Sequence, residues 1–297
     1  MAPPGIKADY YARPMSHRLI ALLALCLSTT VYAQTDVEDL RDIHSARSYG
    51  MGGAYRAMGL GTEAVLGNPA AIALYRMYRM ELHGSWDAHG KDTFGGLSVM
   101  DAKTSALAAG LDYHLLSLRN GAGRTTAHFT TLALAFPITP GVLVGSSVHY
   151  LRARGGPFDA NATTVNAGLL LRFSDGFTVG FSGHNLVDTK NAELTRYYTA
   201  HTGLIAGLLV VGADVRADFD SREGSVFTYN VGAEYILGQV LPVRLGYSYD
   251  GFNETSQLGV GLGFMTQEGG GIDVGYRHDF GGEKGRVLSL SIKMQVG

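Results

Sequence analysis

Alternation between apolar and polar residues is the feature that most constrains the fold, because it recurs along almost the whole chain. In the run FTVGFSGH at 177–184, Phe177, Val179 and Phe181 share one face and are bulky and apolar, and the residues of the other face are small or polar. The run LSLSIKMQV at 288–296 follows the same rule. Successive side chains of a β-strand point to opposite faces, so this period of two predicts strands with one apolar face. We predict about fourteen such strands, at 78–87, 92–101, 104–118, 125–137, 140–153, 161–174, 177–187, 194–205, 207–219, 224–237, 240–250, 255–266, 270–280 and 285–296.

The length and the polar face of these strands favour a membrane barrel over a soluble β-sandwich. Many reach the roughly 9–11 residues that a tilted strand needs to cross a bilayer, whereas strands of soluble proteins cluster near 5–6. Aromatic residues near strand ends, such as Phe173, Tyr235 and Tyr249, are typical of the aromatic girdles of membrane barrels. Nearly every strand also carries charge on its polar face, which would line the interior of a barrel. The charged residues that we expect to face the lumen are Glu81, Asp112, Arg172, Asp214, Arg216, Glu234, Arg244, Asp273 and Arg277.

The connections between the predicted strands alternate in length. PITPG at 137–141 and SDG at 174–176 are short, whereas RARGGPFDANAT at 152–163 and NLVDTKNAEL at 185–194 are long. Bacterial outer-membrane barrels have short periplasmic turns and longer outer loops, and an even number of strands. We therefore predict an all-β fold, a transmembrane antiparallel β-barrel over 78–297 in contact with outer-membrane lipid.

The N-terminal residues predict export. Residues 15–33, MSHRLIALLALCLSTTVYA, combine a basic residue, an apolar stretch and a small-x-small type of cleavage site, as secretory signal peptides do. We assign 1–33 to a signal peptide, with Met15 as an alternative start and Gln34 as the first residue of the mature chain. The expected location is the outer membrane of a Gram-negative cell.

Composition argues against several classes of function. The 24 Lys and Arg residues nearly balance the 26 Asp and Glu residues, so no bulk attraction to nucleic acid is expected. The single cysteine, Cys26, lies in the predicted signal peptide, so we expect neither a disulfide nor a thiolate metal site. No motif suggests a metal or another cofactor. His83, Asp112, His114, His149 and His184 share the polar face, but without a catalytic motif we predict no enzyme.

The segment before the first strand is rich in glycine, with GMGGAYRA at 50–57 and GNPA at 67–70. A phosphate-binding loop would need a preceding strand and a terminal Lys-Ser or Lys-Thr, and neither is present. Glycine permits close backbone approach, and Asn68 before Pro69 is typical of a helix start. We predict that PAAIALYRM at 69–77 forms one short helix and that 34–77 forms a plug inside the barrel. A plain periplasmic linker is the alternative.

The stretch ARSYGMGGAYRAMGLGTEAVLGNPAAIAL at 46–74 resembles the N-terminal signature of FadL-type long-chain fatty-acid transporters and of the related PorV-type barrels. In those families, paired elements similar to 50–55 and 68–70 build a plug or hatch inside a fourteen-stranded barrel. Two later pieces, at 180–188 and 232–250, also resemble PorV-type relatives. The plug or gate residues that the resemblance implies are Gly50, Gly52, Gly53, Asn68, Pro69 and Ala70.

The resemblance leaves two functions open. The first is a passive, gated channel for small hydrophobic molecules, with the plug as the gate; this is the reading we favour. The second is a PorV-like platform that binds secreted proteins or secretion machinery, a reading that the short loops support. Two features of the polar face also remain open. Its charges form either a structural network or a control on solute passage, and its many glycines provide either sheet curvature or room for a plug or ligand.

Overall fold

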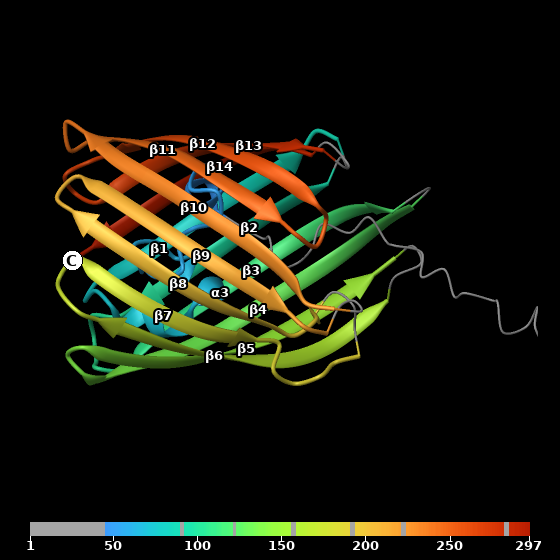
Figure 1. Ribbon diagram of the computed structural model, residues 1–297, viewed down its shortest axis with the longest axis horizontal. Helices are drawn as coiled ribbons and strands as arrows, with labels where there is room; N and C mark the ends of the chain where they lie inside the picture. Colours follow the sequence, from blue (N-terminus) through green and yellow to red (C-terminus); the bar gives the residue numbers. More distant parts are fainter. Residues whose placement is uncertain are drawn as a thin grey trace, which may run out of the picture. The chain divides into compact units, whose positions relative to one another are not determined.

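Figure 1 shows the computed structural model, which describes residues 45–89, 92–120, 123–155, 159–190, 194–220, 224–281 and 285–297. The predicted signal peptide at 1–33, with Cys26, and the first part of the predicted plug, up to residue 44, lie outside the described residues. The bounds 1–33, 34–77 and 78–297 therefore stay predictions.

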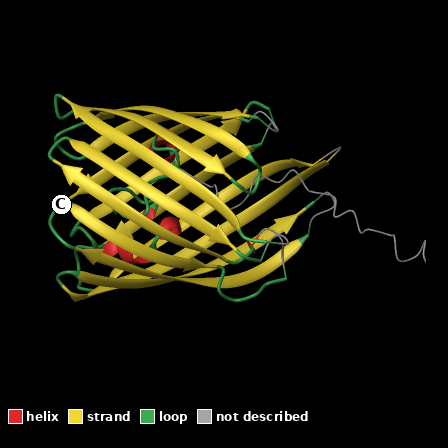
Figure 2. Ribbon diagram, in the orientation of Figure 1, coloured by secondary structure: helices red, strands yellow, loops and turns green. Residues whose placement is uncertain are grey.

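The described strands close into one antiparallel barrel in which each strand pairs with its neighbours in the sequence and β1 pairs with β14. Figure 2 shows the strands surrounding a few short helices. The predicted all-β transmembrane barrel with an N-terminal plug is thus confirmed. The strands are β1 (Tyr78–Asp87), β2 (Thr93–Asp101), β3 (Ala108–Asn120), β4 (Gly123–Thr139), β5 (Val142–Arg154), β6 (Ala160–Arg172), β7 (Phe177–His184), β8 (Tyr197–Ala206), β9 (Leu209–Asp218), β10 (Val226–Leu237), β11 (Leu241–Asp250), β12 (Thr255–Met265), β13 (Gly270–Phe280) and β14 (Arg286–Val296).

The two ends of the barrel differ. We call the end where β14 finishes the turn end, and the opposite end, which carries the β1–β2, β3–β4 and β5–β6 connections, the loop end; the turn end is on the left in Figure 1. At the turn end, β3 begins at Ala108, four residues later than predicted, because the Asp101 carboxylate accepts hydrogen bonds from the backbone N–H groups of Lys103 and Thr104. At the loop end, β7 stops at His184, short of the predicted 187, and Asn185 follows at a φ of 53°.

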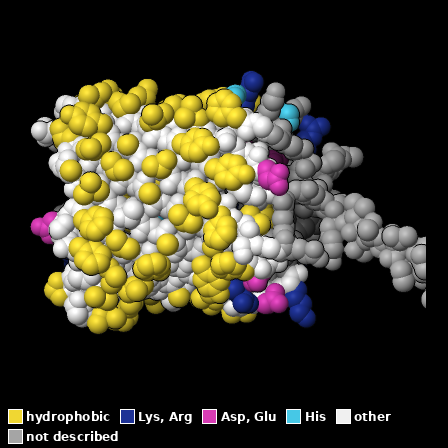
Figure 3. Space-filling model, viewed as in Figure 1, with side chains coloured by type: hydrophobic (Ala, Val, Ile, Leu, Met, Phe, Trp, Pro, Cys, Tyr) yellow, Lys and Arg dark blue, Asp and Glu magenta, His cyan; other side chains and the backbone are white. Residues whose placement is uncertain are grey.

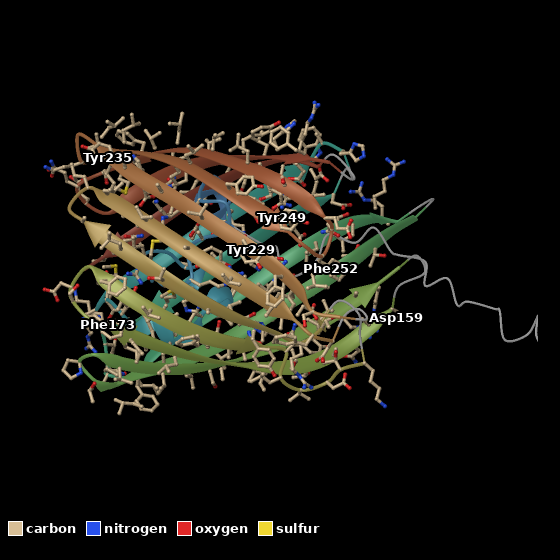
Figure 4. All side chains as sticks on the ribbon, in the orientation of Figure 1. Asp159, Phe173, Tyr229, Tyr235, Tyr249 and Phe252 are labelled. Carbon is tan, nitrogen blue, oxygen red and sulfur yellow. The ribbon has the colours of Figure 1, made fainter. Side chains whose placement is uncertain are left out.

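Burial alternates along the strands in the way that a bilayer requires. The β1 residues alternate between exposed and buried along their whole length. Leu82, Leu245 and Ile292 are each more than half exposed on the outer face. Figure 3 shows hydrophobic side chains covering the wall, with charged side chains at its two ends. Among the labelled aromatics of Figure 4, Phe173 and Tyr235 lie toward the turn end and Tyr249 toward the loop end, as two interfacial girdles require.

Among the described residues, no helix is long and apolar enough to cross a membrane.

Residues 45–77 run through the inside of the barrel to its turn end, where Arg76 is exposed, and form three short helical elements, α2 (Ala46–Gly50), α3 (Ala64–Gly67) and the 3-10 helix η2 (Pro69–Ala73). We call this part of the chain the plug. The prediction of a single helix over 69–77 is wrong in extent and type, because η2 stops at Ala73 and has 3-10 geometry. The predicted start is confirmed: the Asn68 side chain accepts a hydrogen bond from the backbone N–H of Ala70, and Pro69 occupies the first helical turn.

Candidate functional site

Glycines of the barrel wall make room for the plug backbone. A Cβ added at Gly246 or at Gly232 would overlap the Met51 backbone. At Gly145, an added Cβ would lie 2.5 Å from the Pro69 carbonyl carbon. The question left open by the sequence is answered at these positions: the absence of a side chain lets the plug approach the wall. Further wall glycines where a Cβ would collide with the plug are Gly110, Gly168, Gly212, Gly259 and Gly275.

The glycines of the plug itself meet the same constraint from the other side. Gly50 ends α2 and packs against Gly261 of β12, where a Cβ would lie 3.0 Å from the Gly261 Cα. Gly52 has a φ of 59°, and an added Cβ would lie 2.6 Å from the Tyr247 backbone nitrogen. Gly53 also has a positive φ, 80°. Larger residues at Gly52 and Gly53 would be strained by backbone conformation alone.

Asn68 links η2 to β6 and β8 of the wall. It is fully buried, and its Nδ2 lies 2.7 Å from the Nε2 of His201 and 3.4 Å from the Leu169 carbonyl oxygen. Pro69 and Ala70 follow it against Gly145 and Gly168 of β5 and β6. The predicted plug residues therefore contact the wall in two places: Gly50, Gly52 and Gly53 face β10 to β12, and Asn68, Pro69 and Ala70 face β5, β6 and β8.

A buried ion-pair network joins α2 to β10, β11, β13 and β14. The Arg47 guanidinium lies 2.7 Å from a Glu63 carboxylate oxygen and 3.1 Å from Glu234. Burial disfavours the Arg47 cation, but Glu234 and Glu63 outweigh this effect and raise its pKa, so the side chain remains charged. The network continues within the wall, where Arg244 contacts Glu234 and also Asp273, at 2.7 Å.

A second ion pair attaches the plug to β9. Within the wall, Glu234 pairs with Arg244 of the neighbouring strand. Asp214 of β9 instead accepts a hydrogen bond from Arg56 of the plug, at 2.9 Å. Arg216 lies 3.6 Å from Asp250. The plug thus supplies partners that strand alternation alone could not reveal.

The remaining predicted charges lie in smaller groups. Glu81 accepts a hydrogen bond from the Thr62 hydroxyl of the plug at 2.7 Å. Asp112 accepts one from Ser98, and Arg277 lies 3.0 Å from Asp279. Arg172 is half-buried at the turn end and donates to the backbone carbonyl of Leu74. All nine predicted charges therefore sit on the inner side of the wall, eight of them buried.

The histidines form a polar belt inside β1, β3, β5, β7 and β8. The Nε2 atoms of His83 and His114 lie 2.7 Å apart, and His114 Nδ1 lies 2.6 Å from Asp112. His149 contacts the Thr131 hydroxyl at 2.5 Å, and His184 contacts the Ser182 hydroxyl at 2.9 Å. Among the described residues, no group of three or more His, Cys, Asp or Glu side chains is arranged to hold a metal ion.

Part of the lumen is apolar, which the alternation of polar and apolar residues did not predict. Toward the loop end, the inner faces of β2 to β6 change from polar to apolar, as in β3, where the inward series Asp112, His114 continues with Leu116 and Leu118. This switch is visible in LDYHLLSL at 111–118, where leucines continue on the polar face. We call this group the lumen apolar cluster; its members are Tyr49, Phe94, Leu116, Leu118, Ala127, Phe129, Leu151, Ala153, Ala160, Ala162, Leu194 and Val287.

A second apolar cluster lies toward the turn end, between the plug and the same side of the barrel. Ala70, Ala71 and Ile72 of η2 pack there against wall residues that include Leu143 and Leu170. On the other side of the barrel, a polar cavity of about 20 Å³ lies between the plug and β10 to β13. It has room for about one water molecule.

Comparison with known proteins identifies the architecture. The chain matches no sequence-family model and no curated protein. Among solved structures, it resembles a FadL homologue from Pseudomonas aeruginosa, with a TM-score of 0.68, 14% identity and coverage of 84% of this chain and 98% of that one. It also resembles the Pseudomonas putida toluene transporter TodX, with a TM-score of 0.69, 13% identity and coverage of 85% and 97%.

The chain has the fold of a FadL-type barrel. A third similar structure is the CymD monoaromatic hydrocarbon channel, with a TM-score of 0.69, 13% identity and coverage of 84% and 96%. The predicted FadL-type architecture is thereby confirmed. At this level of identity the likeness concerns the fold, and the activity of the chain has to be argued from its own residues.

Proposed function

We propose that this chain is a passive, gated channel for small hydrophobic molecules in the outer membrane of a Gram-negative cell. The observation that carries the proposal is the lumen apolar cluster. A barrel interior that served only to hold polar residues and water would gain nothing from Phe94, Leu116 and Phe129 on its inner face. An apolar inner surface at the loop end suits molecules that leave water to reach it.

The proposed route follows β3 to β6. It begins in the lumen apolar cluster, crosses the belt that contains His114, Thr131 and His149, and reaches the second apolar cluster beneath η2. Because η2 is packed against Gly145 and Gly168, passage requires the plug to move away from this wall. The plug is therefore the gate in this proposal. The proteins of the same fold named as toluene transporters and as a monoaromatic hydrocarbon channel support this class of ligand.

The test is uptake of a labelled long-chain fatty acid and of labelled toluene by a Gram-negative host that lacks its own transporter. Folding of the barrel is verified beforehand by heat-modifiable gel mobility. We expect uptake of at least one of the two compounds above the empty-vector level. A correctly folded barrel that takes up neither would contradict the channel and favour the platform for secreted proteins.

A reversible lock tests the gate separately. The Ala57 Cβ of the plug lies 3.2 Å from the position that a Cβ would take at Gly203 of β8, near the disulfide Cβ–Cβ spacing of about 3.8 Å. In the double variant Ala57→Cys/Gly203→Cys, oxidation should stop uptake and reduction should restore it. Each single cysteine variant serves as the control. Unchanged uptake by the oxidised double variant would show that this part of the plug does not gate.

A further inference from the structure

Arg79 of β1 is a buried cation without a partner. Its side chain faces the lumen near the turn end, and the residue is 2% exposed. None of its three guanidinium nitrogens has a hydrogen-bond partner. Removing a guanidinium from water without replacing its hydrogen bonds is costly, so an unpaired buried arginine calls for a ligand that supplies them.

The nearby carboxylates are engaged elsewhere. Glu63, which acts on Arg79 electrostatically, lies 2.7 Å from Arg47. Glu81, two residues along the same strand, accepts a hydrogen bond from Thr62. In the described part of the chain, no carboxylate lies within ion-pairing distance of Arg79. The cation is therefore available to a negative group from outside the chain.

Tyr75 and Arg172 are two further donors at the turn end. The Tyr75 ring, half-buried, has its centre 6.0 Å from the Arg79 guanidinium carbon. Burial raises the pKa of the Tyr75 phenol, and the Asp175 carboxylate adds to this effect, whereas Arg172 and Arg79 act on the phenol in the opposite direction. Arg172 donates one nitrogen to the Leu74 carbonyl and forms no ion pair within the described residues. The phenol therefore lies within electrostatic reach of two guanidinium groups, from β1 and β6.

We propose that Arg79, Arg172 and Tyr75 form a binding site for a carboxylate at the turn end of the barrel. A carboxylate accepts two parallel N–H bonds from a guanidinium, and a tyrosine hydroxyl donates a further bond to its oxygens. The carboxylate belongs either to a small free acid or to a molecule with an apolar part that packs beside η2. The site lies where the proposed route ends, but it does not depend on transport.

The experiment measures binding of sodium benzoate to the folded, detergent-solubilised protein by titration calorimetry, with benzyl alcohol as the uncharged molecule of similar size. We expect benzoate to bind at least tenfold more tightly than benzyl alcohol. In Arg79→Met, benzoate affinity should fall at least tenfold while benzyl alcohol affinity stays unchanged. Arg76→Gln is the matched control, because Arg76 is an exposed cation at the same end that donates to the Lys103 and Ser105 carbonyls.

The outcomes separate the alternatives. Equal binding of benzoate and benzyl alcohol, or unchanged benzoate affinity in Arg79→Met, would overturn the site, as would preferential binding of inorganic phosphate. Acetate that binds as tightly as benzoate would identify a free carboxylate as the ligand, whereas binding of benzoate alone would show that the apolar part is required.

If Arg79→Met does not fold, Arg172→Gln decides: several-fold weaker benzoate binding supports the site, and full affinity refutes it. Loss of uptake with retained benzoate binding would refute the channel and not this site.

Discussion

At the scale of single residues, the fit between plug and wall depends on glycines, which have no side chain to fill the space between them. Gly246 shows this most clearly, because a Cβ there would collide with the backbone of Met51, which has no flexible end to yield. By contrast, a Cβ at Gly84 on the outer face would have only the Phe94 carbonyl oxygen nearby, at 3.9 Å. Alternation places Gly84 on the outer face and Gly246 on the inner face, but the Met51 backbone opposite Gly246 is known only from the structure.

Gly246→Ala should therefore displace the plug, whereas Gly84→Ala should not. We expect Gly246→Ala to reduce stability by about 1–3 kcal/mol, the usual cost of overpacking, and to increase ion conductance in planar bilayers. Thermal unfolding followed by heat-modifiable gel mobility measures the first effect. Equal behaviour of the two variants would show that the plug is not seated on this glycine.

Asn68 and Pro69 anchor η2 through the cap and the contact with His201. Losing an N-cap costs about 1 kcal/mol, and a buried donor left unpaired costs about 1–3 kcal/mol. The double variant Asn68→Ala/Pro69→Ala should lower the unfolding temperature in detergent and raise ion conductance. Conductance and detergent stability that both remain at the level of the unchanged protein would argue against an anchoring role.

At the scale of elements, the wall is weaker between β6 and β7 than between β5 and β6. The β6–β7 ladder joins Ala167–Arg172 to Thr178–Gly183, whereas β5 pairs with β6 over 160–171. Beyond the end of the shorter ladder, the Leu186 N–H donates to the Val165 carbonyl. Ala160 and Ala162 of the lumen apolar cluster lie behind this part of the wall.

Hydrogen exchange should reveal this difference. The backbone amides of Asn161 and Thr163 point to the same side of β6 as the Val165 carbonyl, where the β7 ladder does not reach. We expect them to exchange faster, by about tenfold or more, than the amides of Ala162 and Thr164, which face β5. Equal protection on both sides would mean that the connection after β7 closes the wall as well as a strand does.

At the scale of the whole molecule, stability should fall at alkaline pH because the plug buries a phenol. Burial raises the pKa of Tyr55, although the Arg56 cation beside it acts in the opposite direction. Above the ordinary tyrosine pKa of about 10, the unfolded chain releases this proton while the folded barrel retains it, so rising pH favours unfolding. The contribution is fully present below about pH 10 and is lost as pH rises above it.

Replacing the phenol tests this contribution. Tyr55→Phe should lose less stability than the unchanged protein between about pH 10 and pH 12, measured by thermal unfolding at each pH. Tyr229→Phe is a matched control, because Tyr229 is half exposed on the outer face. If both variants lose stability in parallel with the unchanged protein, Tyr55 does not control the alkaline limit.

The strands of the barrel could be predicted from the sequence to within a few residues at each end. One face of each strand meets lipid and the other meets the lumen, so apolar and polar residues alternate along the strand itself. The run 78–87 matches β1 at both ends, and the short turns and longer loops follow from local composition. The glycines and Asn-Pro of the plug were visible as well, since backbone freedom and helix starts are local properties.

Only the tertiary structure decided which inner residues meet one another. Arg56 with Asp214, Arg47 with Glu234 and the Met51 backbone beside Gly246 are far apart in the chain, and no pattern along one strand encodes them. The same holds for Arg79, which shares the inner face of β1 with Glu81 and whose guanidinium has no hydrogen-bond partner. Alternation assigns a residue to a face, but the partner on that face depends on barrel closure and on the path of the plug.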